Sequence, residues 1–215
     1  MDEVQIRWVG DSAITVDFER AIDLAVSRRI AGMAECVRAA NVPGVRDVVP
    51  TYAQLAVYFD PMHTDTDRLW STMEAAVAGR GASTEVAREV VVPVEYGGVV
   101  GPDLDDVAAF AGMSSDEVVH LHSSRRYRVF FMGFLPGFPY LGSVDPRISM
   151  PRREHPRSAV PAGAVGIAGR QTGIYPTRAP GGWRIIGRTR LVPFDVQGVP
   201  PCTFRPGDTV RFTEA

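Results

Sequence analysis

The sequence predicts an α+β protein of two domains, a ferredoxin-like domain over residues 1–95 and a mostly β domain over residues 96–215. In the first domain, after an opening hairpin, β-like runs and helical apolar periods follow the order strand, helix, strand, strand, helix, strand, which is the split βαββαβ pattern. In the second, short β-like runs are separated by turns, and twelve of the 17 prolines and twelve of the 21 glycines lie between Gly133 and Gly207. Such spacing is typical of an all-β sandwich or barrel.

Each element of the first domain has a local signal. Gly10-Asp11 is a turn dipeptide between two β-like runs, and Asp65 or Thr66 can cap a helix because a short oxygen-bearing side chain accepts hydrogen bonds from the first free N–H groups. The predicted elements are a hairpin at 4–18, a helix at 21–40, strands at 45–50 and 55–59, a helix from 65 or 66 to about 78, a loop at 79–83 and a strand at 86–94.

The second domain begins with two short helices. Asp103 is the expected N-cap of the first, and Ser114 or Ser115 is the expected N-cap of the second. From Tyr127 onward the helical periodicity disappears. The strand candidates that follow are 128–132, 164–168, 183–187 and 209–213.

Composition excludes several classes of protein. A net charge of -2 and a pI near 6.1 provide no basic face for nucleic acid. We find no apolar run near the ~20 residues that span a bilayer and no secretory signal, so we expect a cytoplasmic protein that does not bind membranes. Cys36 and Cys202 are far apart in the sequence, and we expect both to be reduced.

Lysine is absent from the chain, and all 23 basic residues are arginine. The sequence therefore excludes a P-loop lysine, a Schiff base and a biotinyl-lysine on this chain. Codon usage can explain the bias toward arginine, but the exclusion holds whatever its cause.

The stretch from Phe131 to Arg188 contains most of the candidate site residues. Loops whose shape is fixed by glycine and proline often carry sites. In GFLPGFPYLG, aromatics lie between turns, and Phe138 and Tyr140 are candidates for ligand contact, although core packing is the simpler explanation for Phe138. In PRREHPR, Arg152 and Arg157 can bind a carboxylate or phosphate through their guanidinium forks, and prolines restrain Arg157 in particular.

Two further turns add polar groups. QTGIYP contains the Gln171 amide and the Tyr175 phenol within a glycine-bounded loop, as a site for a small polar amide would require. In PGGW, the backbone at Gly181 and Gly182 can approach an anion closely beside Trp183. This second turn is a weak nucleotide signal, because it is not a G-x-G-x-x-G fingerprint and no helix follows it.

Among the four histidines, His122 is the candidate general base, with a hydrogen-bonding role between the domains as the alternative. His120 and His122 are two apart on a helix and do not share a face, so we predict no metal site there. No G-x-S-x-G elbow or other hydrolase nucleophile motif occurs.

Taken together, these segments resemble one family, the B subunits of bacterial 5-oxoprolinase, also described as allophanate hydrolase subunit 1 or as the KipI-type inhibitor of a sporulation kinase. The motifs that carry the resemblance lie in order between Val94 and Thr189. They are Gly101-Pro-Asp-Leu, Leu121-His122-Ser123, GFLPGFPYLG, PRREHPR, VPAGAVGIAG, QTGIYP and PGGW followed by IIGRT.

The resemblance implies a cyclophilin-like barrel for the second domain, a homologue of the 5-oxoprolinase C subunit and a third subunit as partners, and ATP as co-substrate in opening the lactam of 5-oxoproline. Mg²⁺ is expected with ATP from the chemistry of phosphoryl transfer. Because lysine, a P-loop and an obvious metal cluster are absent, we expect this chain to hold only part of the site, and we predict a site shared between subunits. The predicted catalytic residues are His122, Arg157 and Tyr175, and the predicted substrate-binding residues are Phe138, Tyr140, Arg152, Gln171, Gly181, Gly182 and Trp183.

Proteins of this fold can also have two other functions, and the sequence leaves both open. One is a protein-interaction regulator that inhibits a histidine kinase, and the other is a partner-dependent carboxyltransferase-like domain related to urea carboxylase. Fold alone does not choose among the three.

Overall fold

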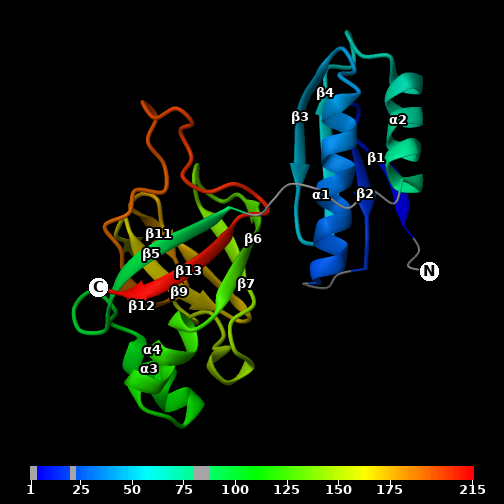
Figure 1. Cartoon of the computed structure of the whole chain (residues 1–215). Helices are drawn as coiled ribbons and strands as arrows, with labels where there is room; N and C mark the ends of the chain where they lie inside the picture. Colours follow the sequence, from blue (N-terminus) through cyan, green and yellow to red (C-terminus); the bar gives the residue numbers. More distant parts are fainter. Residues whose placement is uncertain (1–3, 20–22, 80–87) are drawn as a thin grey trace. The chain divides into compact units, whose positions relative to one another are not determined.

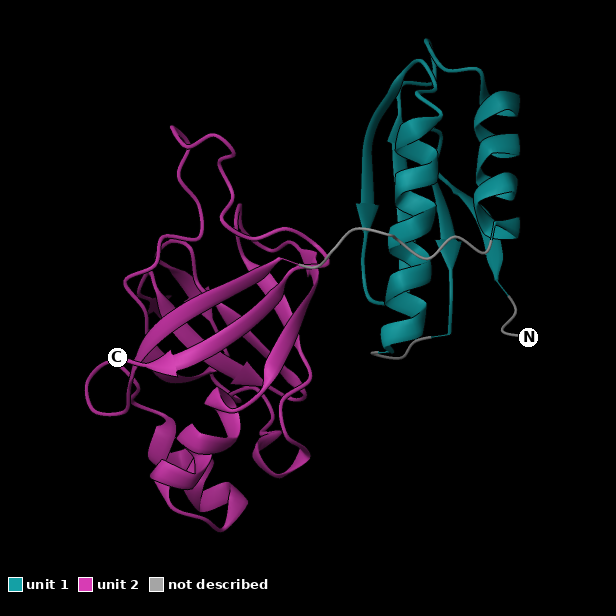
Figure 2. Ribbon diagram, viewed as in Figure 1, with its two compact units in different colours: residues 1–86 teal, residues 87–215 magenta. Residues whose placement is uncertain are grey.

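The computed structural model describes residues 4–19, 23–79 and 88–215 of the chain. The chain divides into two compact units, Met1–Val86 and Ala87–Ala215, which Figure 2 colours separately. Each unit has its own hydrophobic core, as expected of separate domains.

The first unit is an antiparallel sheet with two helices. Its sheet has the strand order β1-β2-β4-β3. The elements are β1 (Gln5–Val9), β2 (Ala13–Asp17), α1 (Leu24–Ala39), β3 (Val45–Pro50), β4 (Gln54–Phe59) and α2 (Thr66–Ala78). Apolar side chains of β2 and β4, including Ile14 and Leu55, form one core with Ile30 and Met73 of the helices.

Aspartates begin both helices of this unit. The Asp23 carboxylate accepts hydrogen bonds from the N–H groups of Ala25 and Val26 at 2.7 and 3.0 Å, and the Asp65 carboxylate caps α2 in the same way. Of the two predicted caps for α2, Asp65 is the observed one. The predicted start of the first helix at Ala21, the predicted loop from residue 80 onward and the first two residues of the strand predicted at 86–94 lie outside the described residues.

The predicted βαββαβ order is wrong in its last strand. The strand after α2, β5 (Glu89–Tyr96), pairs with strands of the second unit, while β1 from the opening hairpin pairs with β2 at the edge of the first sheet. The division therefore falls after Val86, not after residue 95. Sequence periodicity identifies a strand but carries no information about its partner, which explains the error.

The second unit is built on a closed seven-stranded barrel, with neighbours in the order β10-β7-β6-β13-β5-β12-β9. The closed barrel confirms one of the two predicted β architectures. Besides β5, its strands are β6 (Arg126–Met132), β7 (Pro139–Gly142), β9 (Ala164–Ala168), β10 (Gln171–Ile174), β12 (Arg184–Arg188) and β13 (Thr209–Glu214). The four predicted strands correspond to β6, β9, β12 and β13, whereas β7, β10 and the pair β8 (Arg157–Val160) and β11 (Ala179–Gly181) were not predicted.

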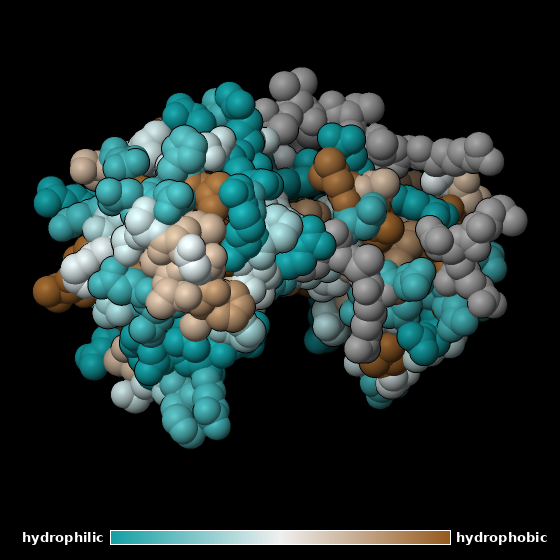
Figure 3. Space-filling view, turned by 90° about the horizontal axis from the view of Figure 1, so that it is seen from below, coloured by the Kyte–Doolittle hydropathy of each residue, from teal (hydrophilic) through white to brown (hydrophobic). Residues whose placement is uncertain are grey.

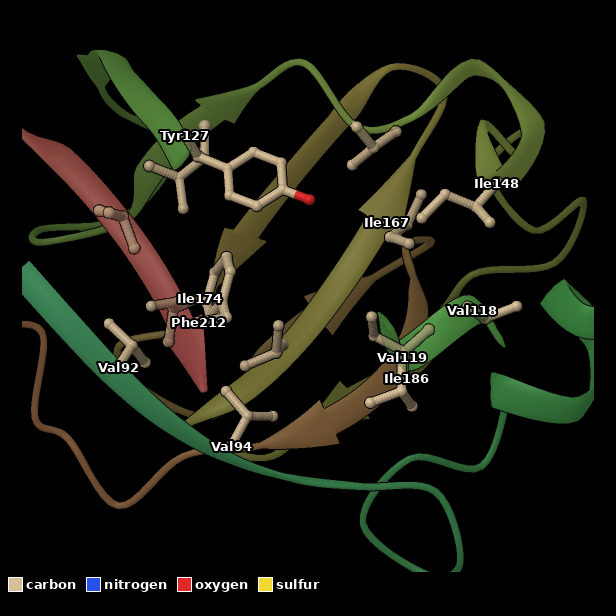
Figure 4. Close-up of a cluster of buried hydrophobic side chains, with 14 of the residues drawn as sticks. Val92, Val94, Val118, Val119, Tyr127, Ile148, Ile167, Ile174, Ile186 and Phe212 are labelled. Atoms are coloured by element: carbon tan, nitrogen blue, oxygen red, sulfur yellow. The ribbon is translucent and has the colours of Figure 1, made fainter. Parts of the chain in front are cut away.

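Alternate side chains of the barrel strands point inward and form its core. Figure 4 shows Val92 and Val94 of β5, Ile167 of β9 and Phe212 of β13 converging on the interior with Tyr127 of β6. Because successive side chains of a β-strand point to opposite faces, the residues between these core positions lie on the outer face of the barrel. The barrel therefore has an inner core and a separate outer surface.

Helices α3 (Leu104–Ala111) and α4 (Ser115–Ser123) lie at one end of the barrel in Figure 1. The Ser114 hydroxyl accepts from the Glu117 N–H at 3.2 Å while the Glu117 carboxylate accepts from the Ser114 N–H, a capping box that starts α4. Val118 and Val119 enter the inner core. A short 3₁₀ turn, η1 (Pro146–Ile148), adds Ile148 to the same core.

Part of the outer face carries a second layer. Strands β8 and β11 form a two-stranded ribbon, and Val160 of β8 packs in a cluster with outward-facing residues of β9 and β12 such as Ala164 and Ile185. Within the described ranges, no helix combines the length and the apolar character needed to cross a bilayer.

Candidate functional site

Five aromatic side chains form a continuous layer on the outer face of the barrel, and we call them the outer aromatic layer: Phe131, Phe138, Tyr140, Tyr175 and Trp183. Phe131 stacks on Tyr140 with ring centroids 4.3 Å apart. The Phe138 ring lies 5.0 to 5.4 Å from the rings of Tyr140, Tyr175 and Trp183, mostly edge to face. Such geometry is favourable for aromatic pairs and holds the layer rigid.

Local irregularities of the sequence place this layer outside the barrel. Tyr127 and Val129 of β6 point inward, and a register shift between Val129 and Phe131 turns Phe131 outward opposite Tyr140. Gly173 of β10 leaves room for Phe138, because a Cβ there would lie 2.9 Å from the Phe138 Cζ. Gly181 likewise lies directly over the Tyr175 hydroxyl.

Gly173→Ala is expected to destabilise the second unit by about 1–3 kcal/mol, because the added methyl group overlaps Phe138 and the Pro139 carbonyl. Denaturant unfolding followed by Trp183 fluorescence measures the effect. Gly182→Ala is the matched control, since its Cβ would meet its nearest neighbour, Pro156, at an ordinary 3.6 Å. Equal stabilities of the two variants would show that the layer can shift to accept a side chain at Gly173.

Asp103 ties the arginine-rich segment to the barrel. Its side chain is only 1% exposed and accepts from Arg157 Nη1 and Nη2 at 2.8 and 2.7 Å, from Arg153 Nη1 at 3.0 Å and from the Ile185 N–H at 2.6 Å. Burial alone would raise the pKa of Asp103, but the hydrogen bonds from Arg157 and Ile185 outweigh it and lower the pKa. The carboxylate is therefore ionised and fixes the loop of residues 151–157 against β12.

Arg152 directly precedes the anchored Arg153 and reaches the outer aromatic layer. Its guanidinium carbon is 6.0 Å from the centre of the Trp183 ring. Burial raises the pKa of Tyr140, and the positive charge of Arg152 partly opposes that rise, so Arg152 also lies near this phenol. Gln171 is half-buried on β10 and alternates with the inward-facing Thr172, which places it on the outer face beside the layer.

The geometry does not support His122 as a general base. The ring is fully buried inside the barrel, stacked on Phe212 at 4.5 Å, and its two nitrogens hydrogen-bond the Tyr96 hydroxyl at 2.8 Å and the Thr172 Oγ1 at 2.9 Å. Burial lowers the pKa of His122 to about 3, so the imidazole is neutral. Its role in this fold is to satisfy buried polar groups.

The other two predicted catalytic residues also have structural contacts. Tyr175 is 1% exposed beneath Gly181, and burial raises its pKa to about 12. Arg157 makes a bidentate pair with Asp103, so its guanidinium fork already holds a carboxylate. Neither is presented to a ligand in this arrangement.

The structure thus brings together the predicted substrate-binding residues, but not the predicted catalytic ones. Phe138, Tyr140, Trp183 and Arg152 meet on one outer face, bordered by the Gly181–Gly182 turn. The sequence prediction assigned Asp103 only an N-cap role, yet its side chain makes no cap hydrogen bond. No local signal could show its pairing with Arg157, which lies 54 positions away.

A second region of interest is a surface hollow at another part of the barrel. Glu95 of β5 and the segment Arg188–Leu191 line two adjoining depressions there, together with Pro93 on one side and Gly163 on the other. None of the predicted site residues lines it. Figure 3 shows hydrophilic residues over most of the face that it draws, with hydrophobic residues as separate patches, so surface hydropathy in that view does not select a site.

Metal ligation has no evident place in the described residues, which contain no group of three or more histidine, cysteine, aspartate or glutamate side chains able to hold an ion. The Asp103 carboxylate, which holds the loop that carries Arg152, is fully engaged by arginines and a backbone N–H. The Mg²⁺ expected with ATP does not fit a site on this face.

The barrel with its outer layer, joined to a small α/β unit, matches a known class of domain. Residues 4–204 match the family model described as "Carboxyltransferase domain, subdomain C and D", and the chain belongs to this family.

Relatives narrow this class to the B subunit of 5-oxoprolinase. The chain is 41% identical to the 5-oxoprolinase B subunit of Escherichia coli O157:H7 over 99% of this chain and 96% of the relative. It is 38% identical to the protein of the same name from Bacillus subtilis (strain 168), over 97% of this chain and 91% of the relative. These identities over nearly complete chains confirm the resemblance that the motifs indicated.

Solved structures support the fold. The structure titled "TTHA0988" aligns over 98% of this chain with a TM-score of 0.84 and 38% identity, and the chain spans 40% of that longer protein. The urea carboxylase of Kluyveromyces lactis aligns over 100% of this chain and 22% of its own length, with a TM-score of 0.80 and 21% identity. At that identity the second likeness concerns the fold alone.

Proposed function

We propose that this chain is a subunit of an ATP-dependent 5-oxoprolinase that opens the lactam of 5-oxoproline to glutamate together with partner subunits. The observation that carries the proposal is the 38–41% identity, over nearly the whole chain, to proteins named as the B subunit of 5-oxoprolinase. The outer aromatic layer with Arg152 is this chain's wall of a site that the partners complete.

The chemistry explains why ATP is needed. A lactam is a poor electrophile, so transfer of the γ-phosphoryl group of ATP to the lactam oxygen, with ADP leaving, turns that oxygen into part of a leaving group. Water then attacks the activated carbon and the ring C–N bond breaks, so that the ring nitrogen becomes the amino group of γ-glutamyl phosphate. A second water hydrolyses this acyl phosphate to glutamate and phosphate. Water is the nucleophile, which agrees with the absence of a hydrolase nucleophile motif in the sequence.

The side chains on this face are suited to binding the substrate, and they are less suited to catalysing phosphoryl transfer. Aromatic faces can pack against the flat lactam ring and exclude water around it, and arginine can neutralise an anionic group. Phosphoryl transfer also requires cations along the transferred group, commonly Mg²⁺ and lysine or arginine. This chain has no lysine, and its described residues offer no metal cluster, so its contribution is limited to arginine, and we assign any lysine and the metal ion to the partner subunits.

Reconstitution tests the proposal. The complex of this chain with a homologue of the C subunit and the third subunit is expected to release glutamate and ADP only when both 5-oxoproline and ATP are present. Omission of this chain should abolish the activity. If the complete complex shows no 5-oxoproline-dependent ATP turnover, the proposed function is wrong.

The family model favours carboxyl transfer as the second candidate, because its description names a carboxyltransferase domain. That reaction would need a biotinyl-lysine from a partner, since this chain has no lysine. Biotin-dependent carboxylation of an amide by the reconstituted proteins, without 5-oxoproline-dependent ATP turnover, would select this function over the first.

A further inference from the structure

We propose that Arg152 binds the carboxylate of the substrate on the outer aromatic layer, and that Asp103 is the positioning residue that reserves Arg152 for this task. The inference deepens the proposed function and rests on it for the identity of the ligand, 5-oxoproline. It differs from the sequence prediction, which favoured Arg157 as the anion-binding residue.

The three arginines of the segment at 151–157 differ in their partners. Arg157 and Arg153 both hold Asp103, with N–O distances of 2.7 and 3.0 Å. In the described part of the chain, Arg152 makes no ion pair, and its side chain is exposed. Asp103 thus engages two of the three arginines and leaves the third, Arg152, available for a ligand.

Backbone contacts fix where Arg152 can reach. The Arg153 N–H donates to the Gly182 carbonyl at 2.7 Å, and the Pro151 carbonyl accepts from Arg184 Nε at 3.3 Å. Arg152 therefore lies between two residues whose backbones are tied to β12 and to the turn before it. A long side chain loses less conformational freedom on binding when its backbone is already held.

The side chain of Arg152 extends over the aromatic layer. It lies 6.0 Å from the Trp183 ring, and its charge opposes the effect of burial on the pKa of both Tyr140 and Tyr175. The guanidinium therefore lies over Trp183 and near two tyrosines that come from two other segments. Its planar fork can bind a carboxylate through two parallel hydrogen bonds.

These features together fit a small, flat carboxylic acid. The ring of such a ligand can pack on the half-buried Phe131 and Tyr140, because the other three rings of the layer are buried, while its carboxylate meets Arg152. Tyr140 also offers a hydroxyl. 5-Oxoproline has this form. ATP also joins an anionic group to a flat ring, so the experiment must separate the two ligands.

The test follows Trp183 within the complete complex. The chain has three tryptophans, at positions 8, 70 and 183. With Trp8→Phe and Trp70→Phe, both in the first unit, 5-fluorotryptophan labels Trp183 alone, and its ¹⁹F resonance reports ligands on the outer aromatic layer whether or not turnover occurs. The titrated ligands are 5-oxoproline, 2-pyrrolidinone, which has the same ring without the carboxylate, and ATP.

The expected result is a carboxylate-specific loss. Arg152→Gln should weaken 5-oxoproline binding by about 10- to 100-fold, as expected for a charge-assisted hydrogen bond, and should leave 2-pyrrolidinone binding within about twofold. Arg190→Gln, which removes the same charge from the hollow, should change neither. An absent ¹⁹F response to 5-oxoproline, equal losses for both lactams, or a loss confined to ATP would each overturn the assignment.

Asp103→Asn tests the positioning role. It should reduce the preference for 5-oxoproline over 2-pyrrolidinone, because Arg152 loses its fixed place, whereas general damage to the layer would weaken both ligands equally. Arg153→Gln keeps the Arg157–Asp103 pair, so it should fold even if the first variant does not, and we expect a smaller loss of preference of about threefold. The positioning role is wrong if Arg153→Gln binds 5-oxoproline over 2-pyrrolidinone with the wild-type preference, and if Asp103→Asn, provided that it folds, does the same. Binding of 5-oxoproline by the wild-type complex without 5-oxoproline-dependent ATP turnover would instead contradict the proposed function.

Discussion

Asp103→Ala is expected to destabilise the second unit by about 3–5 kcal/mol, because the substitution leaves two arginines and a buried backbone N–H without their shared acceptor. Asp103 connects three segments that are far apart in the sequence: the start of α3, the loop before β8 and the strand β12. We therefore expect the loop of residues 151–157 to loosen first. Denaturant unfolding followed by Trp183 fluorescence, in the chain with Trp8→Phe and Trp70→Phe, measures this unit by itself.

Asp106→Ala provides the control on the same helix. Asp106 is 56% exposed and faces Arg184 at 3.5 Å, so its removal should cost less than about 1 kcal/mol. A loss of less than about 1 kcal/mol for Asp103→Ala as well would show that the buried carboxylate does not hold this unit together.

His122 is expected to make the barrel less stable in acid. Burial lowers the pKa of His122 from 6.5 to about 3 in the folded state, so an unfolded chain binds a proton that the folded chain rejects. The stability that the barrel gains from keeping His122 neutral is therefore present above about pH 6.5 and is lost as the pH falls toward 3. Between pH 6.5 and 5 this one group should reduce the free energy of unfolding by about 1.5–2 kcal/mol.

His122→Gln should remove that dependence while retaining hydrogen-bonding groups for Tyr96 and Thr172, although its fit in the core will lower stability at every pH. His120→Gln, an exposed position on the same helix, should keep the wild-type pH dependence. Free energies from urea unfolding at pH 6.5 and 5 decide the matter. If the His122→Gln variant shows the same fall as the wild type, the buried imidazole is not its cause.

Helices could be located from the sequence more readily than the pairing of strands could be predicted. Helical periods and caps located α1, α2, α3 and α4, since these signals are local. Strand β5 was assigned to the wrong unit, because its parallel pairing with β13 joins residues more than a hundred positions apart. The four strands that were not predicted, β7, β8, β10 and β11, are three or four residues long, too short for a period of two to stand out.

Residue types and turns in the sequence predicted which side chains would gather at the candidate site. They did not predict which of the candidate catalytic side chains would be buried. Phe138, Tyr140, Arg152 and Trp183 were predicted together, because glycine- and proline-rich turns concentrate them. His122 and Tyr175 have titratable side chains typical of catalysis, yet the inner core and the Gly181 turn cover them. Only the folded barrel shows that Asp103, and not a ligand, occupies the fork of Arg157.

The central claim is that this chain contributes its outer aromatic layer to the 5-oxoproline site, and the kinetics of two variants test it directly. In the reconstituted complex, Tyr140→Ala should lower kcat/KM for 5-oxoproline at least about tenfold, with near-ultraviolet circular dichroism unchanged apart from the lost tyrosine. Arg190→Ala, in the hollow beside Arg188, should retain the wild-type value. Full activity of Tyr140→Ala together with loss of activity in Arg190→Ala would place the site at the hollow and contradict the account.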